Sequence, residues 1–248
     1  MKKFILMIQF FTRIPINMEI DIKDDDFAKG IVYFPIVGLL IAIVNVLTYL
    51  LFAKVSTGLL PVVMAVLANV LITGALHVDG LADTCDGIYS ARKKERMLEI
   101  MKDSRLGTNG AVAILFDLIL RITLLSSVSE TNIIKVILIT TIISKTMVAV
   151  LAYISPKRKN GLGGLFVGKV SIKNILITLF ICGMSSFLIF GYMALVIIGL
   201  NVVLMIIFRN YILKRLGVIS GDILGAANEV SEIFILVVVI IMQRFLLL

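Results

Sequence analysis

Three aspartates at helical spacing are the residues of this chain best suited to chemistry. Asp79, Asp83 and Asp86 lie within 76–110, a long polar stretch of an otherwise apolar sequence. Because they are separated by four and three residues, a helix would carry the three carboxylates on one face. Mg²⁺ prefers oxygen ligands and often completes its shell with substrate phosphates. The spacing therefore predicts that these aspartates hold Mg²⁺ on a diphosphate.

The neighbours of this acidic row favour a binding site over the alternative, a helix end whose acids merely face water. Gly80 and Gly87 would leave room for a phosphate to approach the backbone. His77 lies beside the row and is predicted to contact the substrate, although a lone histidine is more often a capping or hydrogen-bonding residue.

A second polar group follows in the sequence KDSR at 102–105. Arginine binds phosphate oxygens bidentately, and lysine adds a mobile positive charge. We therefore predict that Lys102 and Arg105 stabilise charge on phosphoryl oxygens and on the leaving group. Asp103 is predicted to be either a further metal ligand or the base that orients a hydroxyl. Ser104 and Gly107 are predicted to contact the substrate.

Three further motifs are candidates for the same site. FTRIP at 11–15 places Arg13 where an N-terminal helix ends, so that it contacts either a lipid headgroup or the substrate. GLGGLF at 161–166 is either a flexible loop or a phosphate-binding lid. The segment 220–229 brings another acid and two glycines to the same side of the membrane. Its predicted substrate-lining residues are Gly221, Asp222, Asn228 and Glu229.

Charged residues also occur inside apolar runs, where they are costly unless paired or functional. Asp117 and Arg121 are four residues apart in one run, so we predict that they pair with each other. Lys145 has no evident partner in its own run. It either neutralises Asp117 or Glu229, or contacts the substrate.

The elements that must position these residues are membrane helices. The chain has 248 residues, is 60% hydrophobic and has a mean hydropathy of +1.08, with repeated apolar runs of spanning length. We predict an all-α, polytopic integral membrane helical bundle that forms a single domain over 1–248. An N-terminal interfacial helix is predicted because Lys2, Gln9 and Arg13 share one helical face. The seven predicted spans are 31–53, 57–76, 109–128, 133–152, 174–190, 193–208 and 226–247, although 174–208 could also be one broken helix.

The distribution of basic residues predicts the orientation of the bundle. The net charge is +8, but the basic residues punctuate the apolar runs and form no soluble face, which argues against a nucleic-acid partner. The segments 1–30, 77–108, 153–173 and 209–225 hold 19 of the 24 basic residues. Seven spans would place all four on one side, which the positive-inside rule makes cytoplasmic. The acidic site is therefore predicted to face the cytoplasm of a bacterial or archaeal cell.

The chain resembles the cobalamin synthase family, the adenosylcobinamide-GDP ribazoletransferases of late vitamin B12 synthesis, along most of its length. The acidic segment is the motif most specific to that family. Ser220 departs from it, since the family usually has threonine there. The matching motifs are FTRIP at 11–15, FPIVG at 34–38, HVDGLAD at 77–83, EIMKDSR at 99–105 with Gly107, and GD at 221–222 with LGA at 224–226.

The resemblance implies a reaction and its partners. Adenosylcobinamide-GDP would be joined to α-ribazole or its 5′-phosphate, giving adenosylcobalamin or its 5′-phosphate and releasing GMP, with Mg²⁺ as cofactor. A ribose hydroxyl would attack the phosphorus that carries the cobinamide arm, so catalysis would rest on positioning and charge neutralisation. The expected partners are these small molecules and the lipid bilayer, and a homo-oligomer is possible.

Two other functions are compatible with an acidic row in a membrane helix. CDP-alcohol phosphotransferases carry aspartates and glycines at helical spacing, but here no GxxxDxxxD follows Asp86. A divalent cation transporter would bind ions at carboxylates near the bilayer midplane. We expect 79–86 to lie at or beyond the end of a span, which favours an enzyme over a transporter.

Overall fold

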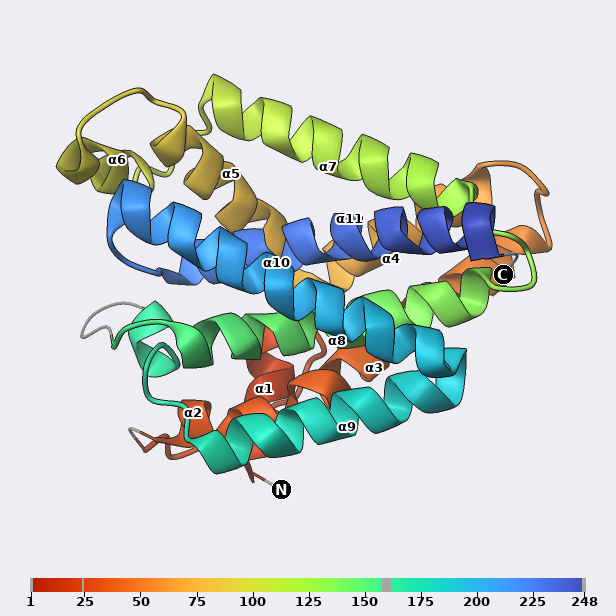
Figure 1. The fold of residues 1–248 in the computed structure, drawn as a ribbon, viewed down its shortest axis with the longest axis horizontal. Helices are drawn as coiled ribbons and strands as arrows, with labels where there is room; N and C mark the ends of the chain where they lie inside the picture. The colour runs from red at the N-terminus through yellow and green to blue at the C-terminus, as the bar shows by residue number, and fades with distance from the viewer. Residues whose placement is uncertain (1, 24, 158–161, 247–248) are drawn as a thin grey trace.

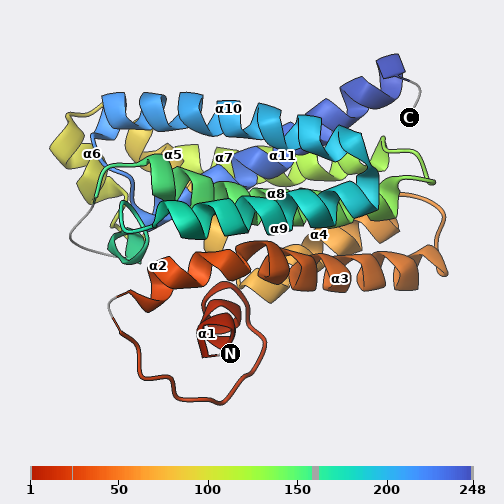
Figure 2. The same cartoon turned by 60° about the horizontal axis from the view of Figure 1, so that its bottom comes forward.

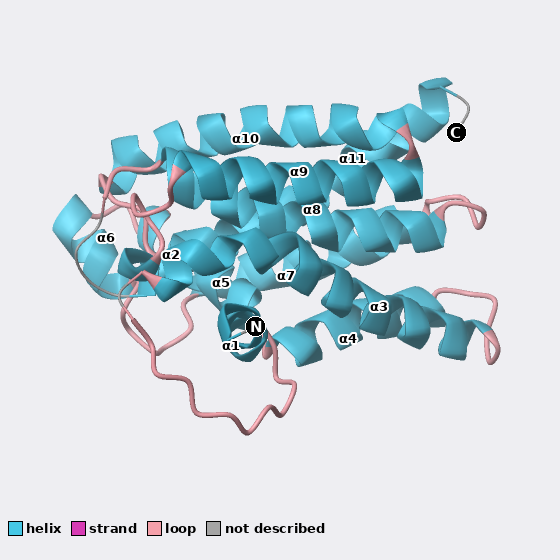
Figure 3. Cartoon of the chain, turned by 90° about the horizontal axis from the view of Figure 1, so that it is seen from below, coloured by secondary structure: helices cyan, strands magenta, loops and turns pink. Residues whose placement is uncertain are grey.

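The computed structural model describes residues 2–23, 25–157 and 162–246, and all of their regular structure is helical (Figure 1). No strand occurs in these ranges, as Figure 3 also shows. The predicted all-α bundle is therefore confirmed. The elements are α1 (Lys2–Phe11), α2 (Asp26–Gly30), η1 (Ile31–Tyr33), α3 (Phe34–Ala53), α4 (Leu60–Thr73), α5 (Leu76–Ile88), α6 (Lys94–Ile100), α7 (Thr108–Ser126), α8 (Ile133–Ile154), η2 (Leu162–Leu165), α9 (Ile172–Phe190), α10 (Tyr192–Leu216) and α11 (Gly221–Leu246).

Six of the predicted spans correspond to long helices that are apolar enough to cross a membrane. The α2–η1–α3 segment is one such span, and α7, α8, α9, α10 and α11 are the others. Gly191, at φ 68°, separates α9 from α10, so 174–208 forms two helices. The helix α10 continues to Leu216, about two turns beyond the predicted end at 208.

The remaining predicted span, 57–76, is not a single straight helix. The helix α4 ends at Thr73 and α5 begins at Leu76, with an angle of 86° between them. Gly74 and Ala75 both have left-handed backbone conformations at this bend, with φ of 61° and 59°. Fourteen residues of α4 reach about 21 Å, which is too short for a bilayer core. Together α4 and α5 are long and apolar enough to cross a membrane, either as one broken span or as a re-entrant segment.

The acidic helix α5 is part of the bundle and does not extend out of it. It packs against α7 and α11, and its apolar residues Val78, Leu81 and Ala82 are buried. Figure 1 shows α5 running from the middle of the bundle towards the end that carries α6. Because α4 and α5 form a bent pair, helix length and composition do not place 79–86 relative to the end of a span, and that expectation stays a prediction.

The most buried helices, α8 and α11, form the centre of the bundle. On α3, Gly38 allows close packing against α8, because a Cβ there would lie 2.7 Å from the Thr141 carbonyl oxygen. The helix α1 lies across the other helices, and Figure 2 shows it nearly end-on beneath α2 and α3. It buries Leu6, Met7, Ile8 and Phe11 against the bundle.

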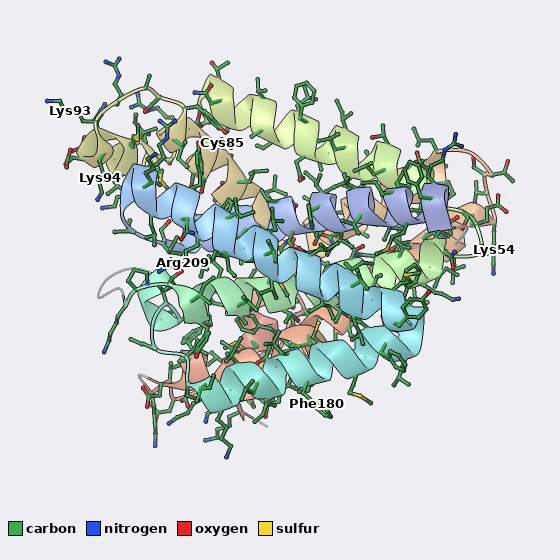
Figure 4. The ribbon with its side chains drawn as sticks, viewed as in Figure 1. Lys54, Cys85, Lys93, Lys94, Phe180 and Arg209 are labelled. Carbon is green, nitrogen blue, oxygen red and sulfur yellow. The ribbon has the colours of Figure 1, made fainter. Side chains whose placement is uncertain are left out.

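The basic connections gather at one end of the bundle. The α5–α6–α7, α8–α9 and α10–α11 connections share that end in Figure 1, while the α3–α4, α7–α8 and α9–α10 connections lie at the other. Figure 4 shows Lys93 and Lys94 at the first end and Lys54 at the second. This arrangement agrees with the pattern on which the predicted orientation depends.

A network of buried charges joins α7, α8 and α11. The Arg121 guanidinium contacts Glu229 at 2.6 Å and Glu232 at 2.7 Å. It also lies 3.5 Å from Asp117, which confirms the predicted pairing within α7. The Lys145 ammonium donates to Asn228 Oδ1 at 2.7 Å and lies 3.9 Å from Glu232. Three helices are thus held together by ion pairs away from solvent.

Candidate active site

Asp79 lies between two hollows, at the point where α1, α5 and α11 meet. The first hollow is a cavity of about 150 Å³ with aromatic walls. The second is larger, about 460 Å³, and more polar. Both are lined by Phe10, Leu76 and Asp79. The first turn of α5 therefore presents an exposed carboxylate to both spaces.

Arg13 lines the larger hollow together with Asp79. Its backbone N–H donates to the Ile72 carbonyl at 2.7 Å, which ties the end of α1 to α4. Its guanidinium packs over Gly74, where a Cβ would overlap it. The glycine at the bend therefore gives space to an arginine as well as allowing the left-handed backbone. This placement supports the substrate-contact alternative for Arg13.

The carboxylates of α5 and α11 are concentrated in this region. Asp83 experiences the negative charges of Asp79, Asp222 and Asp86. Asp222 lies in the first turn of α11, whose backbone approaches α5 so closely that a Cβ on Gly80 would lie 2.6 Å from the Asp222 carbonyl oxygen. The sequence suggested that Gly80 leaves room for a phosphate. The structure shows instead that its missing side chain allows α5 and α11 to pack closely. Repulsion among these carboxylates favours the binding of a cation.

Asp86 has a structural function that its spacing did not predict. Its two carboxylate oxygens accept hydrogen bonds from the backbone N–H groups of Gly107 and Gly110, both at 2.8 Å. These groups lie at the start of α7, where helix N–H groups lack intrahelical partners. Asp86 is only 8% exposed, and a Cβ on Gly107 or Gly110 would overlap its carboxylate. Asp86 and Gly107 thus anchor α7 to α5.

The predicted three-aspartate cluster is therefore divided. Within the described residues, no group of three acidic, histidine or cysteine side chains has the geometry to hold one metal ion. Gly87, like Gly80, is a packing residue, because a Cβ there would meet Met101 and the Met97 carbonyl of α6. Two α5 carboxylates, Asp79 and Asp83, remain near Asp222.

The Asp86 anchor makes a testable prediction. Asp86→Ala should lower the free energy of unfolding by about 2 kcal/mol, because two buried N–H groups lose their acceptors. Asp86→Asn retains one acceptor and should lose less. Thermal unfolding in detergent measures both changes. If Asp86→Asn were as stable as the native protein yet inactive, Asp86 would be a metal ligand after all.

The 102–105 segment lies at the same end of the bundle but forms its own ion pair. Arg105 binds Asp103 through two contacts, of 2.6 Å and 3.0 Å, and its side chain is 86% exposed. Hydrogen bonds from Arg105 lower the pKa of Asp103 to about 2. A carboxylate with that pKa is a weak proton acceptor near neutral pH. The base alternative for Asp103 is therefore disfavoured, and Lys102 and Ser104 are exposed.

This pKa predicts a result for Asp103→Asn. Because Asp103 stays ionised at any pH well above 2, its loss should leave the pH dependence of turnover unchanged between about pH 5 and pH 9. The rate itself should fall by less than about tenfold. Steady-state rates across that range provide the measurement. A variant that lost the fall in rate on the acidic side would identify Asp103 as the base.

Three predicted substrate contacts lie elsewhere. Lys145, Asn228 and Glu229 belong to the buried network and line neither hollow beside Asp79. Their charges and amide groups satisfy one another across α8 and α11. We therefore assign them to structure. Gly221 and Asp222, from the same predicted segment, do line the smaller cavity.

The aromatic walls of that cavity were missed by the sequence analysis. Phe10 and Phe11 come from α1, and Phe166 comes from the segment just after η2. Phe10 makes edge contacts with Phe27 and Phe166, at ring-centroid distances of 5.4 Å and 5.5 Å. Part of the GLGGLF segment is therefore an ordered wall, and its Gly161 lies outside the described residues. In the sequence, only the pair Phe10–Phe11 just before Arg13 indicated an aromatic surface near the site.

The fold and the site together define a polytopic helical membrane protein whose bent α4–α5 pair brings Asp79 to an aromatic-walled cavity. The chain belongs to the cobalamin-5-phosphate synthase family, whose sequence model matches residues 3–240.

Similar proteins named adenosylcobinamide-GDP ribazoletransferase occur in several bacteria. The protein from Clostridium novyi (strain NT) is 50% identical, with 94% of each chain covered. That from Clostridioides difficile (strain 630) is 41% identical over 96% of each chain. That from Thermoanaerobacter sp. (strain X514) is 38% identical over 95% of this chain and 96% of its own. No solved structure matches the chain.

Proposed function

We propose that this protein joins adenosylcobinamide-GDP to α-ribazole or its 5′-phosphate, giving adenosylcobalamin or its 5′-phosphate and GMP. The observation that carries the proposal is the position of Asp79 between the two hollows, in a chain whose relatives share almost its whole length. Membership of this family disfavours a CDP-alcohol phosphotransferase and a cation transporter. The transporter is disfavoured on this ground alone, since the bent α4–α5 pair leaves the position of 79–86 in the membrane a prediction.

In this reaction a ribose hydroxyl of the acceptor attacks the phosphorus that carries the cobinamide arm. The new P–O bond forms as the bond to GMP breaks, and GMP leaves with the electron pair while the hydroxyl loses its proton. We place the diphosphate in the larger hollow, which Arg13 lines and where a guanidinium would bind phosphate oxygens bidentately. A carboxylate on α5 or α11 would orient the attacking hydroxyl and accept its proton.

The donor set fits Mg²⁺. One or two of the carboxylates of Asp79, Asp83 and Asp222 would bind the ion, because Mg²⁺ is commonly bound through one or two carboxylates together with phosphates and waters. A pair of carboxylates without a complete protein shell matches that preference. Bound there, the ion would neutralise negative charge on the diphosphate. Asp83, which experiences the charges of three neighbouring acids, would be relieved of repulsion.

The basic end of the bundle is proposed to face the cytoplasm, in the cytoplasmic membrane of the cell. The connections at that end contain most of the basic residues, which the positive-inside rule assigns to the cytoplasmic side. The α5 helix runs towards this end, so that substrates made in the cytoplasm would reach the site directly.

Purified protein in detergent provides the test. With adenosylcobinamide-GDP, α-ribazole and Mg²⁺, chromatography should detect GMP and adenosylcobalamin in equal amounts, and omission of α-ribazole should abolish both. Detergent removes any ion gradient, so transport cannot account for turnover. Divalent cation flux in liposomes without nucleotide turnover would overturn the proposal.

A further inference from the structure

The aromatic cavity beside Asp79 has a chemical character that the phosphoryl-transfer step does not require. Three phenylalanines, Phe10, Phe11 and Phe166, contribute to its walls, and Asp79 and Asp222 lie at its margin. Its volume of about 150 Å³ matches that of a protein cavity able to hold a benzene ring. The cavity therefore has room and suitable walls for a flat aromatic ring.

One polar group in this wall lacks a partner. His77 is 3% exposed, and its Nε2 makes no hydrogen bond to the described part of the chain. Its ring is stacked on Phe11, with centroids 5.8 Å apart and planes 6° from parallel. A buried polar atom without a partner costs stability, and His77 is one of the residues that line the cavity, so a small side-chain adjustment would let a bound ligand complete it.

We infer that this cavity binds the planar base of the ribazole acceptor, with His77 Nε2 hydrogen-bonded to a ring nitrogen. This inference rests on the proposed function. The base of α-ribazole is a benzimidazole, a fused apolar ring with one nitrogen free to accept a hydrogen bond. That pattern matches three aromatic walls and one polar atom. The attached ribose would then lie at Asp79 and Asp222, where its hydroxyl is needed.

Guanine, the other flat ring among the substrates, fits this wall less well. Its edges carry several donors and acceptors, and each would lose hydrogen bonds to water on entering an aromatic cavity. His77 can replace only one of these hydrogen bonds. The larger hollow, which contains Arg13, Thr12 and Gln9, offers more polar groups for the nucleotide.

Because His77 is the single histidine of the chain, ligand binding can be observed at this one side chain. Protein purified with a histidine-free tag and labelled in histidine should give one imidazole NMR signal. Addition of α-ribazole alone should shift that signal, whereas GMP should not. A shift with GMP and none with α-ribazole would assign the cavity to guanine and overturn the inference. No shift with either would also overturn it.

Kinetics of two substitutions test the same inference during turnover. His77→Phe keeps the stacked ring but removes the nitrogen, so it should raise the KM for α-ribazole about tenfold, the loss of one buried hydrogen bond. The KM for adenosylcobinamide-GDP should not change. His77→Gln retains a donor and should recover part of the loss. Phe180→Leu, an exposed aromatic on α9 shown in Figure 4, is the control and should change neither KM.

The possible failures are separable. If native protein shows the α-ribazole shift but releases no GMP, the base site holds and the proposed reaction fails. If native protein turns over normally but His77→Phe and His77→Gln fold and leave the KM for α-ribazole unchanged, the inference fails and the reaction holds. Should neither variant fold, the NMR titration of native protein still decides.

Discussion

Replacing Asp79 by asparagine should lower GMP release by roughly a hundredfold or more. Asp79 lines both hollows, and its charge is available to the diphosphate and to Mg²⁺. The asparagine side chain has nearly the same size, so helix packing should not change. Asp83→Asn should show a loss of similar order. Initial rates of GMP release in excess Mg²⁺, with both substrates saturating, provide the measurement.

The matched control is Glu130→Gln, which removes an exposed carboxylate from the α7–α8 connection at the other end of the bundle. It should retain full activity. Unchanged elution and thermal unfolding in detergent would show that Asp79→Asn still folds. Near-native turnover of both Asp79→Asn and Asp83→Asn would contradict the proposed metal and diphosphate site.

Replacing Arg121 by methionine should destabilise the folded protein by about 3–5 kcal/mol, the usual cost of breaking a buried ion pair from one side. Arg121 is 4% exposed and contacts Glu229 and Glu232 at under 3 Å. Without it, three buried carboxylates would face the single ammonium of Lys145. A large decrease in the midpoint of thermal unfolding in detergent is the expected result.

An exposed pair on α6 supplies the control for this change. Arg96 lies 2.7 Å from Glu99, but both side chains are more than 60% exposed, so Arg96→Met should alter stability by less than about 1 kcal/mol. Adding Glu229→Gln to Arg121→Met should recover part of the loss by removing one unpaired charge. Equal stability of Arg121→Met and Arg96→Met would show that the buried network does not stabilise the bundle.

Most spans could be predicted from the sequence because a helix that crosses a bilayer requires a long apolar segment, and such segments are visible in the composition. The bend between α4 and α5 is not visible in the composition. Gly74, Ala75 and Leu76 continue the apolar run, and Ala75 adopts a left-handed conformation that alanine rarely takes. The packing of α5 against α7 and α11 selects that conformation, and such packing is not readable from a local sequence window.

The residue types of the candidate site could be predicted from the sequence, but the contacts that each residue makes could not. Helical spacing correctly places Asp79, Asp83 and Asp86 on one helix, but it does not reveal what each carboxylate faces. Asp86 faces N–H groups 21 and 24 residues further along the chain. Lys145 likewise finds its partner Asn228 across 83 residues. Contacts at that separation depend on the tertiary arrangement of helices.

The crosswise position of α1 has a consequence for biogenesis. This helix carries Phe10 and Phe11 to the cavity, yet it is not among the helices long enough to span a membrane. It is synthesised before α5, whose His77 stacks on Phe11, and before α11, which lines the same cavity. We therefore expect that the spanning helices can insert before α1 completes the cavity. A substitution confined to α1 should therefore leave the spanning helices inserted but the cavity lined by Phe10 and Phe11 incomplete.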